Sequence, residues 1–285
     1  MSAAPAVDEH LHLIGGPRAA GVAADAGRVG FKAHNLQRMA LMGVPVPPAF
    51  VLDTALGRRL APGARRLDAV ARECLAEGIR HLEAATGLGF GSGRRPLLVS
   101  VRSGAAVSMP GMLDTVLDVG LCDATVPGLL RLTGNARLVW DCYRRLVRSF
   151  GETVLGLGAA VFDAALSEVL AECRAARVEA LDFRGHRLLA QRYLEAFGRA
   201  AGEPFPQAPQ AQLEAAAAAV YGSWGASRAR SYRSSHGIPD DLGTAVTVQQ
   251  MVFGNAGATS GAGVGFSRDP ATGDRIETWF EVRAK

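Results

Sequence analysis

The sequence has few of the features that mark secreted, disulfide-bonded or metal-binding proteins. Among its 285 residues there are only four cysteines, and no two of them form a CxxC pair. They are Cys74, Cys122, Cys142 and Cys173. Cysteines this scattered are expected to be small buried apolar side chains of an intracellular protein, without a disulfide or metal role. Aromatic residues make up only 6% of the chain, so the core is expected to be aliphatic.

Long apolar runs are also absent. No segment approaches the ~20 residues that span a bilayer, and the N-terminus lacks a basic region followed by an apolar core. We therefore expect a cytoplasmic protein that does not contact a membrane. Its formal charge of +4 reflects 31 Lys and Arg against 27 Asp and Glu, without a basic stripe interleaved with aromatics. This charge favours phosphorylated small molecules over nucleic acid as partners.

The most informative stretch is residues 96–121, PLLVSVRSGAAVSMPGMLDTVLDVGL. Its apolar start, from Leu97 to Val101, has the length and β-branched content of a buried strand. Arg102 follows this strand and leads into a loop of small residues, an arrangement that suits a bound anion. The alternative is an arginine that pairs with a carboxylate near a strand end.

A second candidate site is GFKAHNL at residues 30–36. A glycine turn precedes apolar residues at helical spacing, so Lys32 is expected in the first turn of a helix. A cation there opposes the helix dipole, and a bound phosphate would remove that conflict. The alternative is a solvated lysine.

The remaining pattern predicts helices in the middle and strands at the end. Residues 122–200 carry apolar stripes of helical period. A linker at residues 202–206, in which Gly and Pro interrupt regular structure, leads to an alanine-rich helix. A basic turn is expected next, and then strands at residues 243–253, 261–267 and 276–282. The turn holds Arg228, Arg230 and Arg233. Because the chain stops in what reads as a strand, we expect a fragment or a shortened gene product.

Two histidines near the N-terminus are candidate metal ligands. His10 and His12 alternate with leucines, as on a short edge strand. A metal pair is one interpretation, and surface histidines are the favoured one. His81 falls on the polar side of the helix predicted from Leu67 to Glu83.

Together, residues 96–121, 140–145 and 237–273 resemble the nucleotide-binding domain of pyruvate phosphate dikinase. The family pattern runs close to SVRSGAxxSMPGMxDTxLxxGL and GTAVxVQxMVFGNxGxxSGxGVxFTRNPxTG. The SMPGM loop is more similar to this family than to phosphoenolpyruvate synthase or rifampin phosphotransferase. The resemblance extends over most of residues 28–275, and is looser in the helical middle.

This resemblance implies an α+β chain with an ATP-grasp-like fold, in which two lobes clamp ATP and magnesium and a helical insertion is present. It implies a phosphotransferase that converts ATP, phosphate and pyruvate to AMP, diphosphate and phosphoenolpyruvate. The phosphoryl group would pass to a phosphohistidine domain and then to a pyruvate-binding barrel, neither of which lies in these residues. We expect a first lobe at 1–121, a helical insertion at 122–207 and an incomplete second lobe at 208–285.

The resemblance also implies roles for particular residues. Lys32 and Arg102 match phosphate-binding residues, and their positive charges would stabilise phosphoryl transfer. Thr115 matches the threonine of a loop over the phosphates. The strand edge that lines the adenine pocket is matched by Gln249, Gln250, Met251 and Val252.

Two departures from the family pattern bear on activity. The family's GGKG turn is Gly30-Phe31-Lys32-Ala33 here, and losing two glycines tightens the approach to phosphate. The magnesium ligands are expected beyond Lys285, so we expect weak or absent ATP binding by these residues alone, and no overall reaction. The alternative is a shortened non-catalytic paralogue that binds nucleotide or a partner protein.

Overall fold

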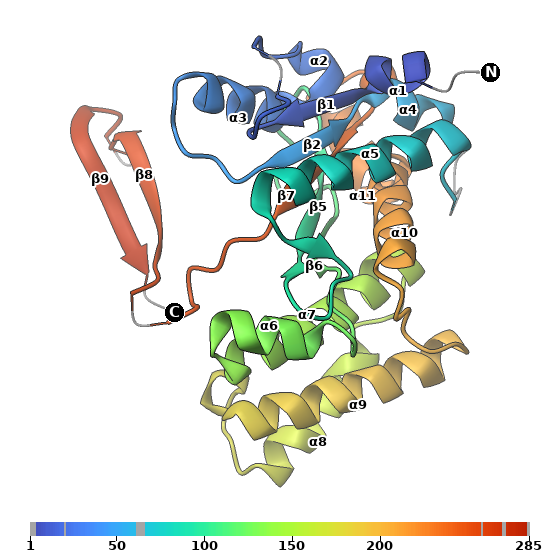
Figure 1. The fold of residues 1–285 in the computed structure, drawn as a ribbon, viewed down its shortest axis with the longest axis vertical. Coiled ribbons are helices and arrows are strands. Elements are labelled where there is room, and N and C mark those ends of the chain that lie inside the picture. The colour runs from blue at the N-terminus through green and yellow to red at the C-terminus, as the bar shows by residue number, and fades with distance from the viewer. Residues whose placement is uncertain (1–3, 20, 61–65, 258, 270–271, 284–285) are drawn as a thin grey trace.

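The computed structural model of this chain describes residues 4–19, 21–60, 66–257, 259–269 and 272–283. At its centre is a five-stranded sheet with the strand order β1-β2-β7-β5-β6, in which all neighbouring strands are antiparallel (Figure 1). Its strands are β1 (Leu11–Ile14), β2 (Ala49–Leu52), β5 (Val99–Gly104), β6 (Thr115–Val119) and β7 (Ala245–Gln250). The mixture of helices with an antiparallel sheet confirms the predicted α+β class.

Two smaller sheets complete the strands. One is the parallel pair β3 (Gly89–Phe90) and β4 (Pro96–Leu97), and the other is the antiparallel hairpin β8 (Ala262–Arg268) and β9 (Arg275–Arg283). The hairpin stands apart from the central sheet in Figure 1. The strand predicted from Leu97 to Val101 is divided between β4 and β5, so Arg102 lies within a strand and not after one.

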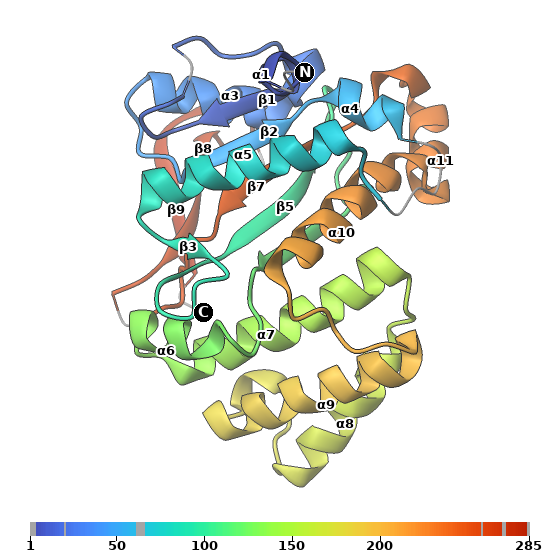
Figure 2. The same cartoon turned by 45° about the vertical axis from the view of Figure 1, so that its right-hand side comes forward.

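Helices cover both faces of the central sheet. On one face lie α5 (Ala69–Thr86) and α10 (Pro209–Gly222), which Figure 2 shows side by side along the sheet. On the other lie the short α2 (Ala26–Val29) and α3 (Phe31–Leu41). Successive residues of β2 alternate accordingly: Phe50 and Leu52 join the large core, and Val51 joins the small one. Burial on both faces explains why β2 reads as a continuous apolar run.

The middle of the chain is helical, as predicted. It contains α6 (Val126–Thr133), α7 (Ala136–Phe150), the π-helical turn η1 (Gly151–Leu155), α8 (Ala160–Glu172), η2 (Val178–Ala180) and α9 (Phe183–Ala201). Helix α7 packs on β6, and one buried cluster runs from the sheet into these helices. The division into parts at 1–121, 122–207 and 208–285 stays a prediction. None of the helices in the described ranges has the length and apolarity needed to cross a membrane.

The predicted basic turn is wrong, because its residues form helix α11 (Ser227–His236). Inside this helix Arg233 is buried, stacks on the Trp224 ring at 4.1 Å and donates to Asp240. These contacts of Arg233 stabilise α11, a polar helix with too few regularly spaced apolar residues to pack by a hydrophobic face. The remaining helical elements are α1 (Ala4–His10), α4 (Thr54–Arg59), η3 (Ser223–Gly225) and η4 (Asp240–Leu242).

The prediction that the cysteine side chains are buried is confirmed for three of the four residues. Cys74, Cys122 and Cys142 are buried free thiols, but Cys173 is exposed. Cys173 is the residue that ends α8. The buried positions of α8 end at Val169, four residues before Cys173.

Candidate functional site

The first turn of α3 is packed directly on the end of β5. The N–H of Phe31 donates to the carbonyl of Ala105 at 3.0 Å, and Gly30 precedes the helix with φ of 82°. A Cβ on Gly30 would lie 2.5 Å from the backbone of Gly104, so this approach requires glycine. Two segments that are far apart in the sequence are thereby brought together.

A cavity of about 670 Å³ opens where these two segments meet. Lys32 from the first turn of α3, Arg102 from β5 and Thr115 from β6 all line it. Arg102 and Thr115 are direct neighbours across the β5–β6 pair, because their Cα atoms are partners in the register. The structure therefore gathers at one cavity three residues that the sequence assigned to phosphate groups.

Neither cation of this cavity is neutralised within the described ranges. No carboxylate there pairs with Lys32 or Arg102, unlike Arg28, Arg144 and Arg228, which all form ion pairs. Helix α3 also has no side-chain cap, and the N–H groups of Lys32 and Ala33 have no hydrogen-bond partner in this part of the chain. Two unpaired cations and a free helix N-terminus favour a bound anion.

Two polar side chains of the cavity were missed by sequence reasoning. Asn35 lies three residues after Lys32 and so on the same side of α3, and Ser103 follows Arg102 on β5. The helical period could have identified Asn35, because residues i and i+3 share a face. Ser108, from the loop quoted for the family resemblance, also lines the cavity.

The residues matched to an adenine pocket lie elsewhere. Gln249 to Val252 do not line this cavity. Arg102 pairs with Thr247, and Gln250 lies three residues further along β7, about 10 Å away at ~3.3 Å per residue. Gln249 is paired on both sides, so it is not on a strand edge, and its side chain donates to Pro47 O at 3.1 Å. Their assignment to adenine stays a prediction.

A magnesium site does not fit the described side chains of this cavity. Its lining contains no Asp or Glu, and the described ranges hold no group of three His, Cys, Asp or Glu that could bind a metal ion. The nearest acid in sequence is Asp114, next to Thr115, and it is paired with Arg228. Magnesium prefers carboxylate and other oxygen ligands, so no magnesium ligand is assigned to these residues.

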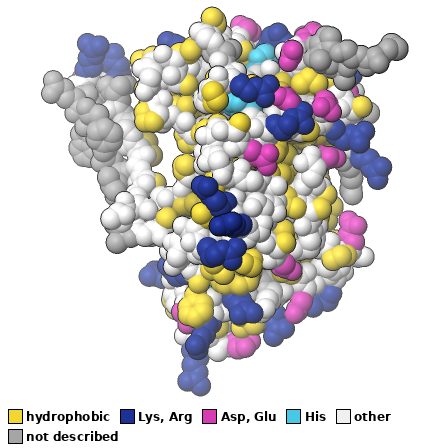
Figure 3. Space-filling view, viewed as in Figure 1, with side chains coloured by type: hydrophobic (Ala, Val, Ile, Leu, Met, Phe, Trp, Pro, Cys, Tyr) yellow, Lys and Arg dark blue, Asp and Glu magenta, His cyan; other side chains and the backbone are white. Residues whose placement is uncertain are grey.

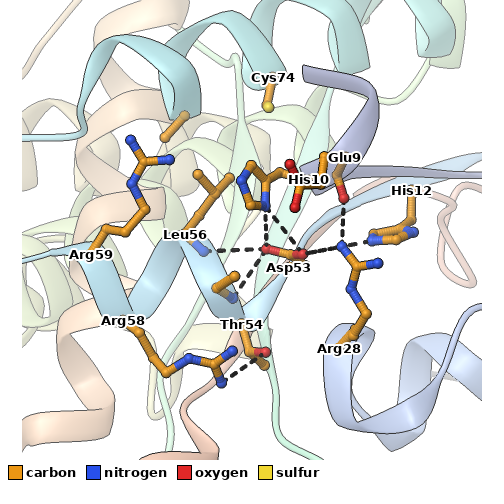
Figure 4. A network of polar contacts seen from close by, with 12 residues as sticks. Glu9, His10, His12, Arg28, Asp53, Thr54, Leu56, Arg58, Arg59 and Cys74 are labelled. Atoms are coloured by element: carbon orange, nitrogen blue, oxygen red, sulfur yellow. Dashed lines mark hydrogen bonds and ion pairs between the residues drawn. The ribbon is translucent and has the colours of Figure 1, made fainter. Parts of the chain in front are cut away.

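The histidines near the N-terminus belong to a different group, centred on the buried Asp53 (Figure 4). Asp53 caps α4 through the N–H groups of Ala55 and Leu56, and accepts from His10 at 3.1 Å and Arg28 at 2.8 Å. His12 Nε2 lies 4.0 Å from the carboxylate, beyond hydrogen-bond range. This group ties the end of α1 and helix α2 to the start of α4.

Electrostatics around Asp53 favour its charged form. Burial by itself would raise the pKa of Asp53, but His12, Arg28 and His10 outweigh it and hold that pKa well below its usual range. The interpretation of His10 and His12 as surface residues is therefore wrong, since both side chains are largely buried against Asp53. His81 is also fully buried, within reach of Ile14 O at 3.4 Å, and not on a polar helix face.

A second cavity, of about 620 Å³, lies between α4 and the start of α11. Arg58, Trp224 and Arg230 are among its lining residues, and Arg58 donates to backbone carbonyls of η4. It contains none of the residues that the sequence assigned to phosphate. Surface charge is otherwise interspersed: on the face in Figure 3, basic and acidic side chains are mixed, apart from a short basic column above α6.

Comparison with known proteins supplies the family. The pyruvate phosphate dikinase AMP/ATP-binding domain matches residues 67–282 of the chain. The chain belongs to this family. It is 43% identical over 265 residues to the pyruvate, phosphate dikinase of Rhizobium meliloti, 42% identical over 253 residues to that of Giardia intestinalis, and 39% identical over 248 residues to that of Clostridium symbiosum. These matches cover 93%, 87% and 87% of this chain.

The relatives are much longer than this chain. The same matches cover 30%, 28% and 28% of the three relatives, so the chain spans less than a third of their length. Arg102 and Thr115 lie within the residues matched by the family. Lys32 precedes them, but a match of 265 residues in a chain of 285 includes it.

Proposed function

We propose that this chain is the ATP-binding portion of a pyruvate phosphate dikinase, and that the cavity between α3 and β5 receives the phosphate groups of ATP. The observation that carries the proposal is the meeting of Lys32 and Arg102, both without a carboxylate partner in the described ranges, at the free N-terminus of α3. An ATP-grasp-like fold, in which a second lobe would close over the nucleotide, is part of this proposal.

The two cations suit different tasks at a phosphate chain. The ammonium of Lys32 is a compact charge on a flexible stem, whereas the planar guanidinium of Arg102 can donate two parallel hydrogen bonds to one phosphate group. The hydroxyl of Thr115 and the N–H groups of Lys32 and Ala33 add donors without adding charge. Positive charge and donors held in place stabilise the negative charge that spreads over a transferred phosphoryl group.

The overall reaction is proposed from the relatives' names and the resemblance. ATP, phosphate and pyruvate would give AMP, diphosphate and phosphoenolpyruvate, with a phosphohistidine domain and a pyruvate-binding barrel carrying the later steps. This chain would supply the site at which ATP phosphates leave for the histidine. Magnesium would neutralise phosphate charge in such a reaction, and no described residue of the cavity is assigned to it. A cytoplasmic location is part of the proposal.

Titration of the ¹⁵N-labelled chain with ATP into the millimolar range tests the site by NMR. Shift changes are expected at the amides of Lys32, Ala33 and Ser103, even if affinity is weak. Arg102→Ala and Lys32→Ala should each weaken binding by about tenfold or more, since hydrogen bonds to charged groups contribute ~1.5–3 kcal/mol.

The matched control is Arg95→Ala, an exposed arginine before β4 that does not line the cavity. Its affinity should equal that of the unmodified chain. Shift changes confined to the second cavity around Trp224, or affinity unchanged by Arg102→Ala, would place the phosphates elsewhere and overturn the assignment.

A further inference from the structure

The loop between β5 and β6 forms one wall of the cavity and has few anchors. Residues 105–114 join the two strands, and seven of them line the cavity: Ala105, Val107, Ser108, Met109, Pro110, Gly111 and Leu113. Its start is held by the bond from Phe31 N–H to Ala105 O. Within the loop there is one turn, closed by Met112 N–H to Met109 O at 3.2 Å.

The end of this loop is held by a single side chain from helix α11, which is distant in the sequence. The Nε of Arg228, on α11, donates to the carbonyl of Met112 at 3.2 Å, and its Nη2 pairs with the carboxylate of Asp114. Among the described residues, no other side chain donates to residues 105–114. A guanidinium makes two contacts in a fixed geometry, which a lysine ammonium does not reproduce.

Asp114 has an electrostatic consequence for the cavity. It directly precedes Thr115, one of the lining residues, and its carboxylate carries a negative charge close to the place proposed for phosphates. Like charges at such a distance oppose each other, and partial exposure lessens the repulsion without removing it. The ion pair with Arg228 neutralises Asp114 and holds its carboxylate outside the cavity, since Asp114 is not among the lining residues.

We propose that Arg228 is a positioning residue for the nucleotide site, which fixes the 105–114 loop as a wall of the cavity and cancels the charge of Asp114 beside the phosphates. This inference rests on the proposed function for the identity of the ligand. The loop-fixing part concerns this chain alone. Arg228 acts through the loop and is not itself among the residues that line the cavity.

Hydrogen exchange and ATP affinity, measured on the same variants, separate the two parts. In Arg228→Ala, amide exchange of the peptide covering residues 105–115 should become faster, because the side-chain anchor at the end of the loop is lost. ATP affinity should fall about fivefold, since an uncompensated carboxylate then faces the phosphates in a partly screened setting.

The double variant Arg228→Ala/Asp114→Asn removes the charge but leaves the loop unanchored. Its loop exchange should stay fast, while its ATP affinity should recover a large part of the fivefold loss. Arg228→Lys keeps a positive charge near Asp114 but lacks the planar guanidinium that makes both contacts. It should therefore show intermediate loop exchange and nearly normal ATP affinity. It also serves if the alanine variant does not fold.

Arg230→Ala is the matched control, because Arg230 is exposed two residues along the same helix and its side chain has no hydrogen bond or ion pair in the described part of the chain. It should leave loop exchange and affinity unchanged. Loop exchange that is equal in Arg228→Ala and the unmodified chain overturns the positioning role. If the loop loosens but no variant, nor the unmodified chain, binds ATP, the proposed function fails and the loop anchor stands.

Discussion

Among individual residues, Asp118 is the most unusual acid in the described structure. It is buried, its backbone has a φ of 60°, and its carboxylate faces Cys142 of α7. Burial raises the pKa of Asp118 from 3.8 to about 7, although the Cys142 thiol and Arg145 partly oppose this rise. Asp and Asn adopt a positive φ more readily than most residues, which explains an acid at this position.

The raised pKa makes Asp118 a source of pH-dependent instability. Between about pH 4 and 7 the unfolded chain carries the charge and the folded chain does not, so stability falls as pH rises through this window. Asp118→Asn should therefore stabilise the protein at pH 8 by roughly 2–4 kcal/mol, at ~1.4 kcal/mol per unit of pKa, and change little at pH 4.

Urea unfolding of both proteins at the two pH values measures this effect. Asp241→Asn is the control, because Asp241 is exposed and its side chain forms no bond in the described ranges. An Asp118→Asn gain that is the same at pH 4 and pH 8 would contradict a buried neutral acid, and would indicate a packing effect instead.

At the scale of single elements, the docking of α3 on β5 decides whether Lys32 and Arg102 share one cavity. Gly30 and Gly43 form a natural pair for testing this, because their φ values are 82° and 80°. A Cβ at Gly43 meets no atom within 4 Å, whereas one at Gly30 collides with the backbone of Gly104. Both alanine variants would be strained, but only one would displace the helix.

Gly30→Ala should therefore destabilise the protein by about 3 kcal/mol and weaken ATP binding as α3 moves away from β5. Gly43→Ala should lose only about 1 kcal/mol, from backbone strain, and keep its ATP affinity. Thermal unfolding and the NMR titration measure both effects. Equal affinity in the two variants would show that the site tolerates displacement of α3.

Helices with a strong apolar period were predicted correctly, whereas a helix that is held in place by one buried side chain was not. The apolar period predicts a helix from Leu67 to Glu83, and the structure has α5 at Ala69–Thr86, with Asp68 capping its start and Gly87 ending it at a φ of 65°. Helix α11 was missed because Ser, Arg and His dominate it, and burial of Arg233 against Trp224 is a tertiary contact.

At the scale of the whole molecule, the sheet and the helical middle share one core. Phe205, in the connection after α9, packs against Tyr143, Phe150 and Phe197, with ring centroids 5.4 Å apart in the last two pairs. The buried cluster that contains these rings continues through α10 to the strands β5 and β7. Continuous burial favours unfolding of the two regions as one cooperative unit.

This cooperativity can be measured with the three tryptophans. In variants that keep only Trp140, in the helical middle, or only Trp224, near α11, the two fluorescence transitions in urea should coincide in midpoint and slope. Trp279 is replaced in both. A Trp140 transition at clearly lower urea would show that the helical segment unfolds on its own.

The local structure and the chemical character of this protein can be predicted from its sequence. The apolar run before Arg102, the helix with Lys32 in its first turn and the SMPGM loop predict an anion site, and the motif pattern identifies the family. These features depend on residues near one another in the chain, where side-chain period and backbone preference act directly.

How these segments meet depends on the folding of the whole chain. Gly30 can approach the backbone of Gly104 closely because it has no Cβ, and this approach brings Lys32 and Arg102 to the same cavity. The contacts of Arg228 with Met112 and Asp114 join residues that are more than a hundred positions apart in the sequence. Contacts of this kind depend on strand order and on how helices pack against the sheet, and no local pattern encodes either. They arise because folding removes apolar surface from water across the whole chain, and all the elements must pack together to do so.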